Sequence, residues 1–196
     1  EPSQLYLNGL QRERFLKVID HILTYSTIIG LSSHQDYRQL KLPYPLQTYF
    51  SGPKDDLKPL FLDYAKHYQA DVTWAHALTV QKRKVACVAS SLHMAWFKFA
   101  DIAQIPRCQR DYLELAQRYK MIFISEVPAF QEHDNATVIL WMHLIDVLYN
   151  AQIKLLISAD APIEALYPAN GPMYLPFQRT ISRMQEMQSV GYWQHC

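Results

Sequence analysis

The sequence predicts an α/β fold in which helices alternate with strands, together with a smaller β-rich segment. Two compact apolar runs, 121–125 and 153–159, have the length and composition of buried strands. Each follows a stretch in which apolar residues recur at helical spacing, 111–119 and 136–150 respectively. Such alternation is typical of a layer of parallel strands covered by helices. Of the 196 residues, 49% are hydrophobic, so the chain can fill a sizeable core.

The first quarter of the chain predicts a helix and two short strands. Apolar residues recur at helical spacing from Leu10 to Tyr25, after the turn formed by Asn8-Gly9, and the helix should end near Ser26. Residues 27–32 and 37–42 are rich in strand-forming residues. Breakers of regular structure then indicate a loop: Pro43, Pro45, Gly52 and Pro53.

The middle of the chain predicts one more helix and three strands. Pro59 fits the first turn of a helix that extends to about Tyr68. Three strand-like runs follow, over residues 72–80, 85–89 and 94–99, and Gln81 to Lys84 form a basic turn between the first two.

Residues 177–189 predict a helix with two unlike faces. An apolar stripe consists of Phe177, Ile181, Met184 and Met187. Arg179 and Arg183 lie one turn apart on another face, and two aligned guanidinium groups suit a phosphate. The alternative is a surface helix with an Arg183–Glu186 pair, worth only a few tenths of a kcal/mol.

Composition and spacing argue against several other classes of protein. The net charge is +1, and no apolar run approaches the ~18 residues of a membrane span, so we expect no membrane span and no general affinity for nucleic acid. His133 and His143 lack the spacing of metal ligands, so no metal site is expected. The three cysteines show neither a disulfide framework nor zinc-ligand spacing, which favours a reducing cytoplasm.

Several segments of the chain follow one another in the order found in a known family. These are 5–15 (LYLNGLQRERF), 36–38 (DYR), 106–116 (PRCQRDYLELA), 144–149, 154–159, 166–167 and the arginine helix at 177–189. Together they resemble the ZapE family of AAA+ ATPases, bacterial cell-division proteins related to the mitochondrial Afg-type (lactation-elevated) ATPases. Residues 43–80 match this family only weakly.

The resemblance implies an incomplete AAA+-type ATPase. In this family the phosphate-binding loop and the Walker B strand precede the Leu-Tyr-x-Asn-Gly segment, which begins here at Leu5. A phosphate-cradling loop needs glycines, and none of the 5 glycines lies between Pro53 and Asn170. We therefore expect the carboxyl-terminal portion of a longer ATPase, inactive alone. Its expected parts are the end of the AAA+ core at 1–42, a variable segment at 43–90 and an α/β region at 91–196.

The resemblance also implies roles for four arginines. Arg14, directly before Phe15, best matches an arginine finger that reaches the neighbouring subunit's γ-phosphate, and Arg12 is the second candidate. The alternative for Arg12 is a surface pair with Glu13 or Asp20. Arg179 and Arg183 are candidates for sensing nucleotide or for a structural anchor; Arg179 is the stronger functional candidate.

A weak internal repeat supports a similar arrangement in the second half. The order Leu-Tyr, Asn-Gly, Gln-Arg at residues 5–12 recurs at 166–179, which predicts a strand, a turn and an arginine helix. At 139–143, where the family usually has an Arg-Arg pair, this chain has apolar residues and a histidine. That departure indicates a divergent member.

The resemblance finally implies cofactors, partners and a location. ATP and Mg²⁺ are expected to bind the full-length protein, and no cofactor is expected for this chain alone. FtsZ or other divisome proteins are the expected partners, with a homo-oligomer when full length, in the cytoplasm at the division septum. The alternative hypothesis is a non-catalytic interaction module that retains only the partner-binding half.

Overall fold

The computed structural model describes residues 12–26, 47–52, 57–105 and 107–195, except the side chains of Arg14, Phe15 and His195. The chain comprises two compact units, residues 1–36 and 37–196. Helix α1 (Arg12–Tyr25) is the described part of the first unit and confirms the predicted first helix. The strands predicted at 27–32 and 37–42 lie outside the described residues. None of the helices in the described ranges has the length and apolar composition that a membrane span requires.

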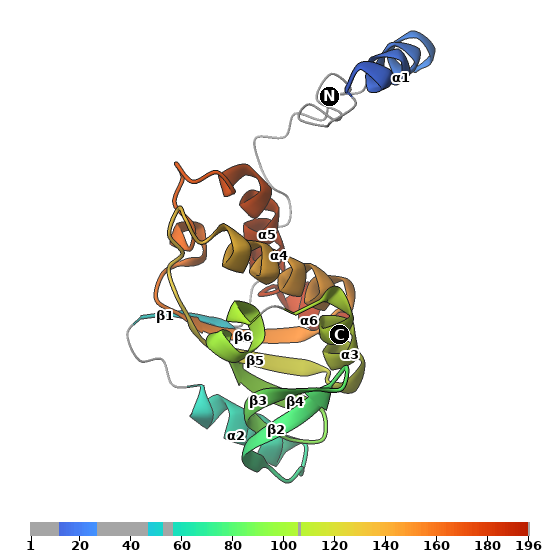
Figure 1. Cartoon of the computed structure of the whole chain (residues 1–196). Coiled ribbons are helices and arrows are strands. Elements are labelled where there is room, and N and C mark those ends of the chain that lie inside the picture. Colours follow the sequence, from blue (N-terminus) through green and yellow to red (C-terminus); the bar gives the residue numbers. More distant parts are fainter. Residues whose placement is uncertain (1–11, 27–46, 53–56, 106, 196) are drawn as a thin grey trace. The chain divides into compact units, whose positions relative to one another are not determined.

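A six-stranded mixed sheet organises the second unit, with the order β1-β6-β5-β4-β3-β2 (Figure 1). The strands are β1 (Tyr49–Ser51), β2 (Thr73–Val80), β3 (Arg83–Ser90), β4 (Met94–Lys98), β5 (Met121–Val127) and β6 (Lys154–Ala159). β1, β6, β5 and β4 are parallel to one another, whereas β3 and β2 continue the sheet antiparallel. The predicted α/β class is therefore confirmed, and so are the five strands predicted from residue 72 onward.

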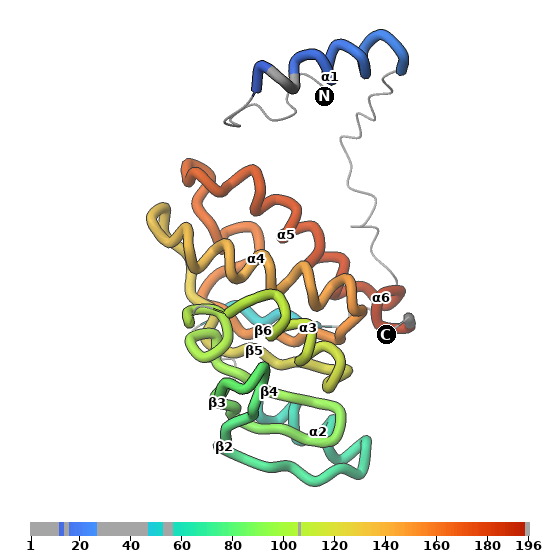
Figure 2. The backbone as a smooth tube through the Cα atoms, turned by 45° about the vertical axis from the view of Figure 1, so that its right-hand side comes forward, coloured from blue at the N-terminus to red at the C-terminus, as the bar shows by residue number. Residues whose placement is uncertain are grey.

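Helices cover both faces of this sheet (Figure 2). One face carries α2 (Lys58–His67), and the other carries α3 (Gln109–Arg118), α4 (Asn135–Asn150) and α5 (Tyr174–Glu186). Successive side chains of a strand point to opposite faces of the sheet, so adjacent residues of β4 pack in different hydrophobic clusters. Trp96 packs in the cluster around α2, and Phe97 belongs to the larger core under α3, α4 and α5.

The sequence did not predict three smaller helices or strand β1. A π-helix (Ala100–Gln104), a 3-10 helix (Ile163–Ala165) and α6 (Val190–His195) complete the described elements. β1 lies within the segment expected to be a loop, and it pairs with β6 at the edge of the sheet. Its end is tied by Gly52, whose N–H donates to the carbonyl of Ala159 at 3.1 Å. A three-residue strand is too short to show any periodicity, which explains the omission.

The β2–β3 hairpin is held by helix α3. Its two-residue turn consists of Gln81 and Lys82, both with positive φ (46° and 63°), as the right-handed twist of a tight hairpin requires. The Gln81 N–H donates to Oε2 of Glu114 at 2.9 Å, and Arg118 donates to the carbonyl of Thr79 at 2.7 Å. The basic turn predicted at 81–84 is therefore a docked hairpin.

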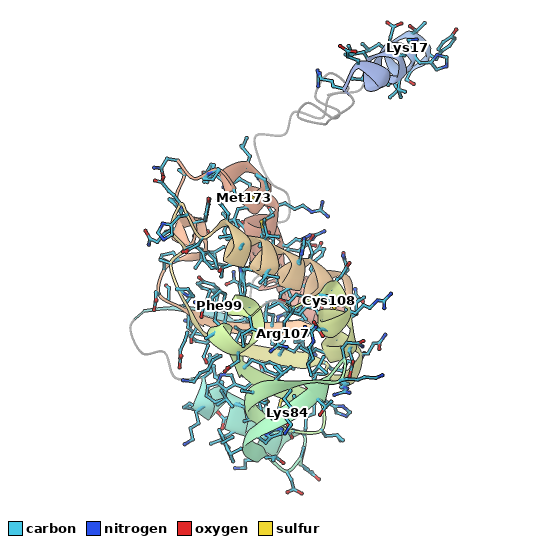
Figure 3. All side chains as sticks on the ribbon, in the orientation of Figure 1. Lys17, Lys84, Phe99, Arg107, Cys108 and Met173 are labelled. Atoms are coloured by element: carbon cyan, nitrogen blue, oxygen red, sulfur yellow. The ribbon has the colours of Figure 1, made fainter. Side chains whose placement is uncertain are left out.

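A buried carboxylate completes this docking at the amino end of α3, where Figure 3 labels Cys108. The side chain of Asp111 is fully buried, accepts the N–H of Cys108 at 2.7 Å and forms an ion pair with Arg83. Burial alone would raise the pKa of Asp111. The hydrogen bonds from Cys108 and Arg83 outweigh this effect, so the pKa lies below its ordinary value.

We expect Asp111→Asn to destabilise the protein at neutral pH by about 1–3 kcal/mol, because the ion pair and the capping hydrogen bond lose their charge. A depressed pKa contributes stability above the unfolded value of about 3.9, and this contribution is lost as pH falls through the folded value. Urea denaturation of both proteins from neutral pH downward should show the difference shrinking below about pH 4. Asp63→Asn, at an exposed position of α2, is the control. A difference that stays constant with pH would contradict this role.

Candidate functional site on the arginine helix

The start of helix α5 is set by a close contact between Gly171 and Tyr167. A Cβ atom at Gly171 would lie 2.5 Å from the ring of Tyr167, whose side chain is buried, so only glycine fits. The Tyr167 hydroxyl accepts the N–H of Met173 at 3.2 Å, one residue before α5 begins (Figure 3). The Leu-Tyr and Asn-Gly motifs of the internal repeat thus shape the turn that begins the arginine helix.

After β6 the chain forms the 3-10 helix Ile163–Ala165, this turn and then α5. Leu166 and Tyr167 are not in a strand, so the segment 166–179 contains the turn and the start of the helix but no strand. The predicted apolar stripe is confirmed. Its members are all buried, at 0–6% exposure: Phe177, Ile181, Met184 and Met187. Burial of this stripe against the main core fixes which residues of α5 remain at the surface.

Arg183 lies on the buried side of α5 and joins it to helix α4. Its side chain is 7% exposed and forms an ion pair with Asp146, which is 37% exposed. The guanidinium also lies over the ring of Tyr149, with Cζ 4.9 Å from the ring centre. The Tyr149 hydroxyl in turn donates to Oε2 of Glu186 at 2.7 Å. These contacts form a polar clamp between α4 and α5.

Arg179 lies one turn earlier on α5, and its surroundings are different. It is exposed, and no described residue forms an ion pair or hydrogen bond with it. Leu175, at the preceding helical turn, is 81% exposed, and Pro176 is also exposed. A guanidinium that pairs with no described residue and lies beside exposed apolar side chains can reach a ligand or another protein surface.

The other two predicted site residues belong to the first unit. Arg12 is the first residue of α1 and is partly buried. Arg14 lies within the same helix, but its side chain is outside the described residues. The preference for Arg14 over Arg12 as the arginine finger therefore stays a prediction.

Sequence reasoning missed the partners of Arg183 on α4. Asp146 and Tyr149 are three residues apart, so both face the same side of that helix. This spacing is visible in the segment Leu-Ile-Asp-Val-Leu-Tyr at 144–149, and it could have indicated a polar pair within an otherwise apolar helix. The sequence could not show that helix α5 packs against this pair on α4.

The chain is similar to curated proteins from bacteria and eukaryotes. It is 33% identical to an uncharacterised protein of Schizosaccharomyces pombe, over 85% of this chain and 37% of that protein. It is 27% identical to the cell division protein ZapE of Escherichia coli strain K12, over 97% of this chain and 51% of that protein. It is 27% identical to lactation elevated protein 1 homolog B of Danio rerio, over 98% of this chain and 45% of that protein.

The chain thus spans about half or less of the length of these relatives. No solved structure matches it. The model of the AFG1-like ATPase family matches residues 1–196, and this match agrees with the ordered motifs and with the α/β fold. The chain therefore belongs to the AFG1-like ATPase family.

Proposed function

We propose that this chain is the carboxyl-terminal part of a ZapE-like ATPase that uses ATP to act on the FtsZ ring during cell division. Family membership supports the ATPase part of this proposal, and the similarity to a cell division protein supports the process. The structural observation that most supports the proposal is the difference between two arginines on helix α5. Arg183 is buried in the clamp with Asp146, whereas Arg179 is exposed and has no partner among the described residues.

Because their surroundings differ, we assign different roles to the side chains of Arg179 and Arg183. The clamp of Arg183 holds α5 at a fixed position on α4, so we assign Arg183 a positioning role; its direct contact with nucleotide stays a prediction. Arg179 then extends from a rigid helix, as a side chain that recognises phosphate should. The planar guanidinium can bind a phosphate through two parallel hydrogen bonds, so Arg179 is the proposed nucleotide-sensing residue.

The first unit supplies the proposed catalytic arginine. Arg14, with Arg12 as the second candidate, would stabilise the charge that develops on the transferring phosphoryl group of a neighbouring subunit. This role requires a homo-oligomer of the full-length protein, and it requires ATP with Mg²⁺ bound in the half that carries the phosphate-binding loop. The proposed location is the cytoplasm at the division septum.

We expect Arg179→Lys in the full-length protein to lower the ATPase rate by about tenfold or more, since lysine keeps the charge but loses one bidentate contact of about 1.5–3 kcal/mol. Stability should change by no more than about 0.5 kcal/mol, because the side chain is exposed. ATPase rate and thermal melting are measured together for each variant. Arg110→Lys, at an exposed position of α3, is the matched control.

Two outcomes would contradict the proposal. A rate for Arg179→Lys equal to that of Arg110→Lys would remove Arg179 from the nucleotide site. Absence of Mg-ATP hydrolysis by the full-length wild-type protein would instead favour the alternative, a non-catalytic interaction module.

A further inference from the structure

A cavity of about 400 Å³ lies at the amino ends of three parallel strands, and none of the described residues that line it belongs to the arginine helix α5. The described residues that line it are Tyr68, His93, Met94, Lys120, Met121 and Lys154. Met94, Met121 and Lys154 are the first residues of β4, β5 and β6. Tyr68 comes from the end of α2. A cavity of this volume accommodates one or two large side chains of a ligand.

The floor of this cavity is apolar, and apolar surface continues beyond it. Met94 and Met121 are buried, with 1% and 2% exposure. Tyr68 is 43% exposed at the rim, and Leu92, next to the lining residue His93, is 71% exposed. Exposed side chains of this size next to a hollow are typical of a surface that binds an extended ligand.

The rim carries positive charge that no described carboxylate neutralises. Among the described residues, no carboxylate lines the cavity and none forms an ion pair with Lys120 or Lys154. Lys120 directly precedes β5 and Lys154 begins β6, and the two residues are joined because the N–H of Lys154 donates to the carbonyl of Lys120 at 3.0 Å. The Lys154 ammonium lies 5.6 Å from the ring centre of Trp193 on α6, which holds it at this end of the sheet.

We propose that this cavity binds an acidic linear segment of a partner protein. One large apolar side chain of the segment enters the cavity and packs on Met94 and Met121, and flanking carboxylates pair with Lys120 and Lys154. The apolar surface at Tyr68 and Leu92 favours a peptide over a small carboxylate, because a compact ligand would leave that surface uncovered. The site is independent of the nucleotide role of Arg179.

The test uses the complete chain and a fluorescein-labelled peptide, Asp-Asp-Ile-Phe-Asp-Glu, with binding measured by fluorescence anisotropy. We expect saturable binding that weakens as salt rises. Lys120→Glu and Lys154→Glu should each weaken binding by about tenfold or more, since a favourable charge contact becomes a repulsive one. Lys84→Glu, an exposed lysine on β3, is the matched control and should bind as the wild type does. Circular dichroism confirms that each variant is folded.

Three results would overturn the proposal. The first is unchanged binding by Lys120→Glu, which alters an exposed side chain and leaves the cation–π contact of Lys154 intact. The second is equal binding of a peptide with serine in place of isoleucine and phenylalanine, because the cavity would then play no part. The third is displacement of the peptide by decanoate at equal concentration, which would assign the cavity to a small apolar carboxylate.

Discussion

Replacement of Arg183 by alanine is expected to lower the free energy of unfolding by about 3 kcal/mol or more, the largest stability effect among the arginines of α5. The guanidinium is 7% exposed, pairs with Asp146 and lies over Tyr149, so an ion pair and a cation–π contact are lost together. Breaking a buried ion pair by removing one partner typically costs about 3–5 kcal/mol, and the loss here lies at the lower end because Asp146 is 37% exposed. The packing of the arginine stem between α4 and α5 adds to this loss.

Urea denaturation of the wild type, Arg183→Ala and Arg179→Ala measures this effect directly. Arg179→Ala is the matched control, because it removes the same side chain from an exposed position of the same helix, and its change should stay within about 0.5 kcal/mol. A double-mutant cycle with Asp146→Asn should show that the two substitutions are not additive. Equal effects of the two arginine variants, or additivity in the cycle, would show that the clamp does not hold α5.

The sequence predicted most of the regular structure of the second unit because its patterns are long. The stripe at Phe177, Ile181, Met184 and Met187 repeats over several turns, and each member proved to be buried. β1 was missed because its three residues carry no periodic signal, and its partner β6 lies far along the chain. Pairing of distant segments is a property of the folded sheet, so no local pattern encodes it.

The sequence predicted the spacing of residues within the candidate site, but it did not predict their contacts with distant parts of the chain. That Arg179 and Arg183 lie one turn apart follows from helical spacing alone. Which of the two is buried depends on α4, because Asp146 and Tyr149 receive Arg183 across the helix interface. The cavity lined by Lys120 and Lys154 was not predicted either, since its walls come from three strands and the end of α2.

Arg14→Ala in the full-length protein is expected to reduce ATP turnover by ~10³-fold or more, while nucleotide affinity changes by only a few fold. An arginine finger acts on the charge of the transition state, so its removal lowers the rate without a comparable loss of ground-state binding. Steady-state ATPase assays give the rate, and titration with a fluorescent ATP analogue gives the affinity. Arg12→Ala is the matched comparison on the same turn of α1. If turnover persists in Arg14→Ala and is lost in Arg12→Ala, the arginine finger is Arg12 and the assignment of Arg14 is wrong.

Mixing of subunits tests whether this arginine acts on a neighbour. Subunits with Arg14→Ala keep an intact nucleotide site, whereas subunits with the lysine of the phosphate-binding loop replaced keep Arg14 but cannot bind ATP productively. Each preparation alone should be inactive. In a mixed oligomer, an intact nucleotide site can face an intact Arg14, so activity should return in proportion to the mixed interfaces. If the mixture stays inactive although size-exclusion chromatography shows that the two variants co-assemble, the arginine acts within its own subunit, and the proposed intersubunit site is wrong.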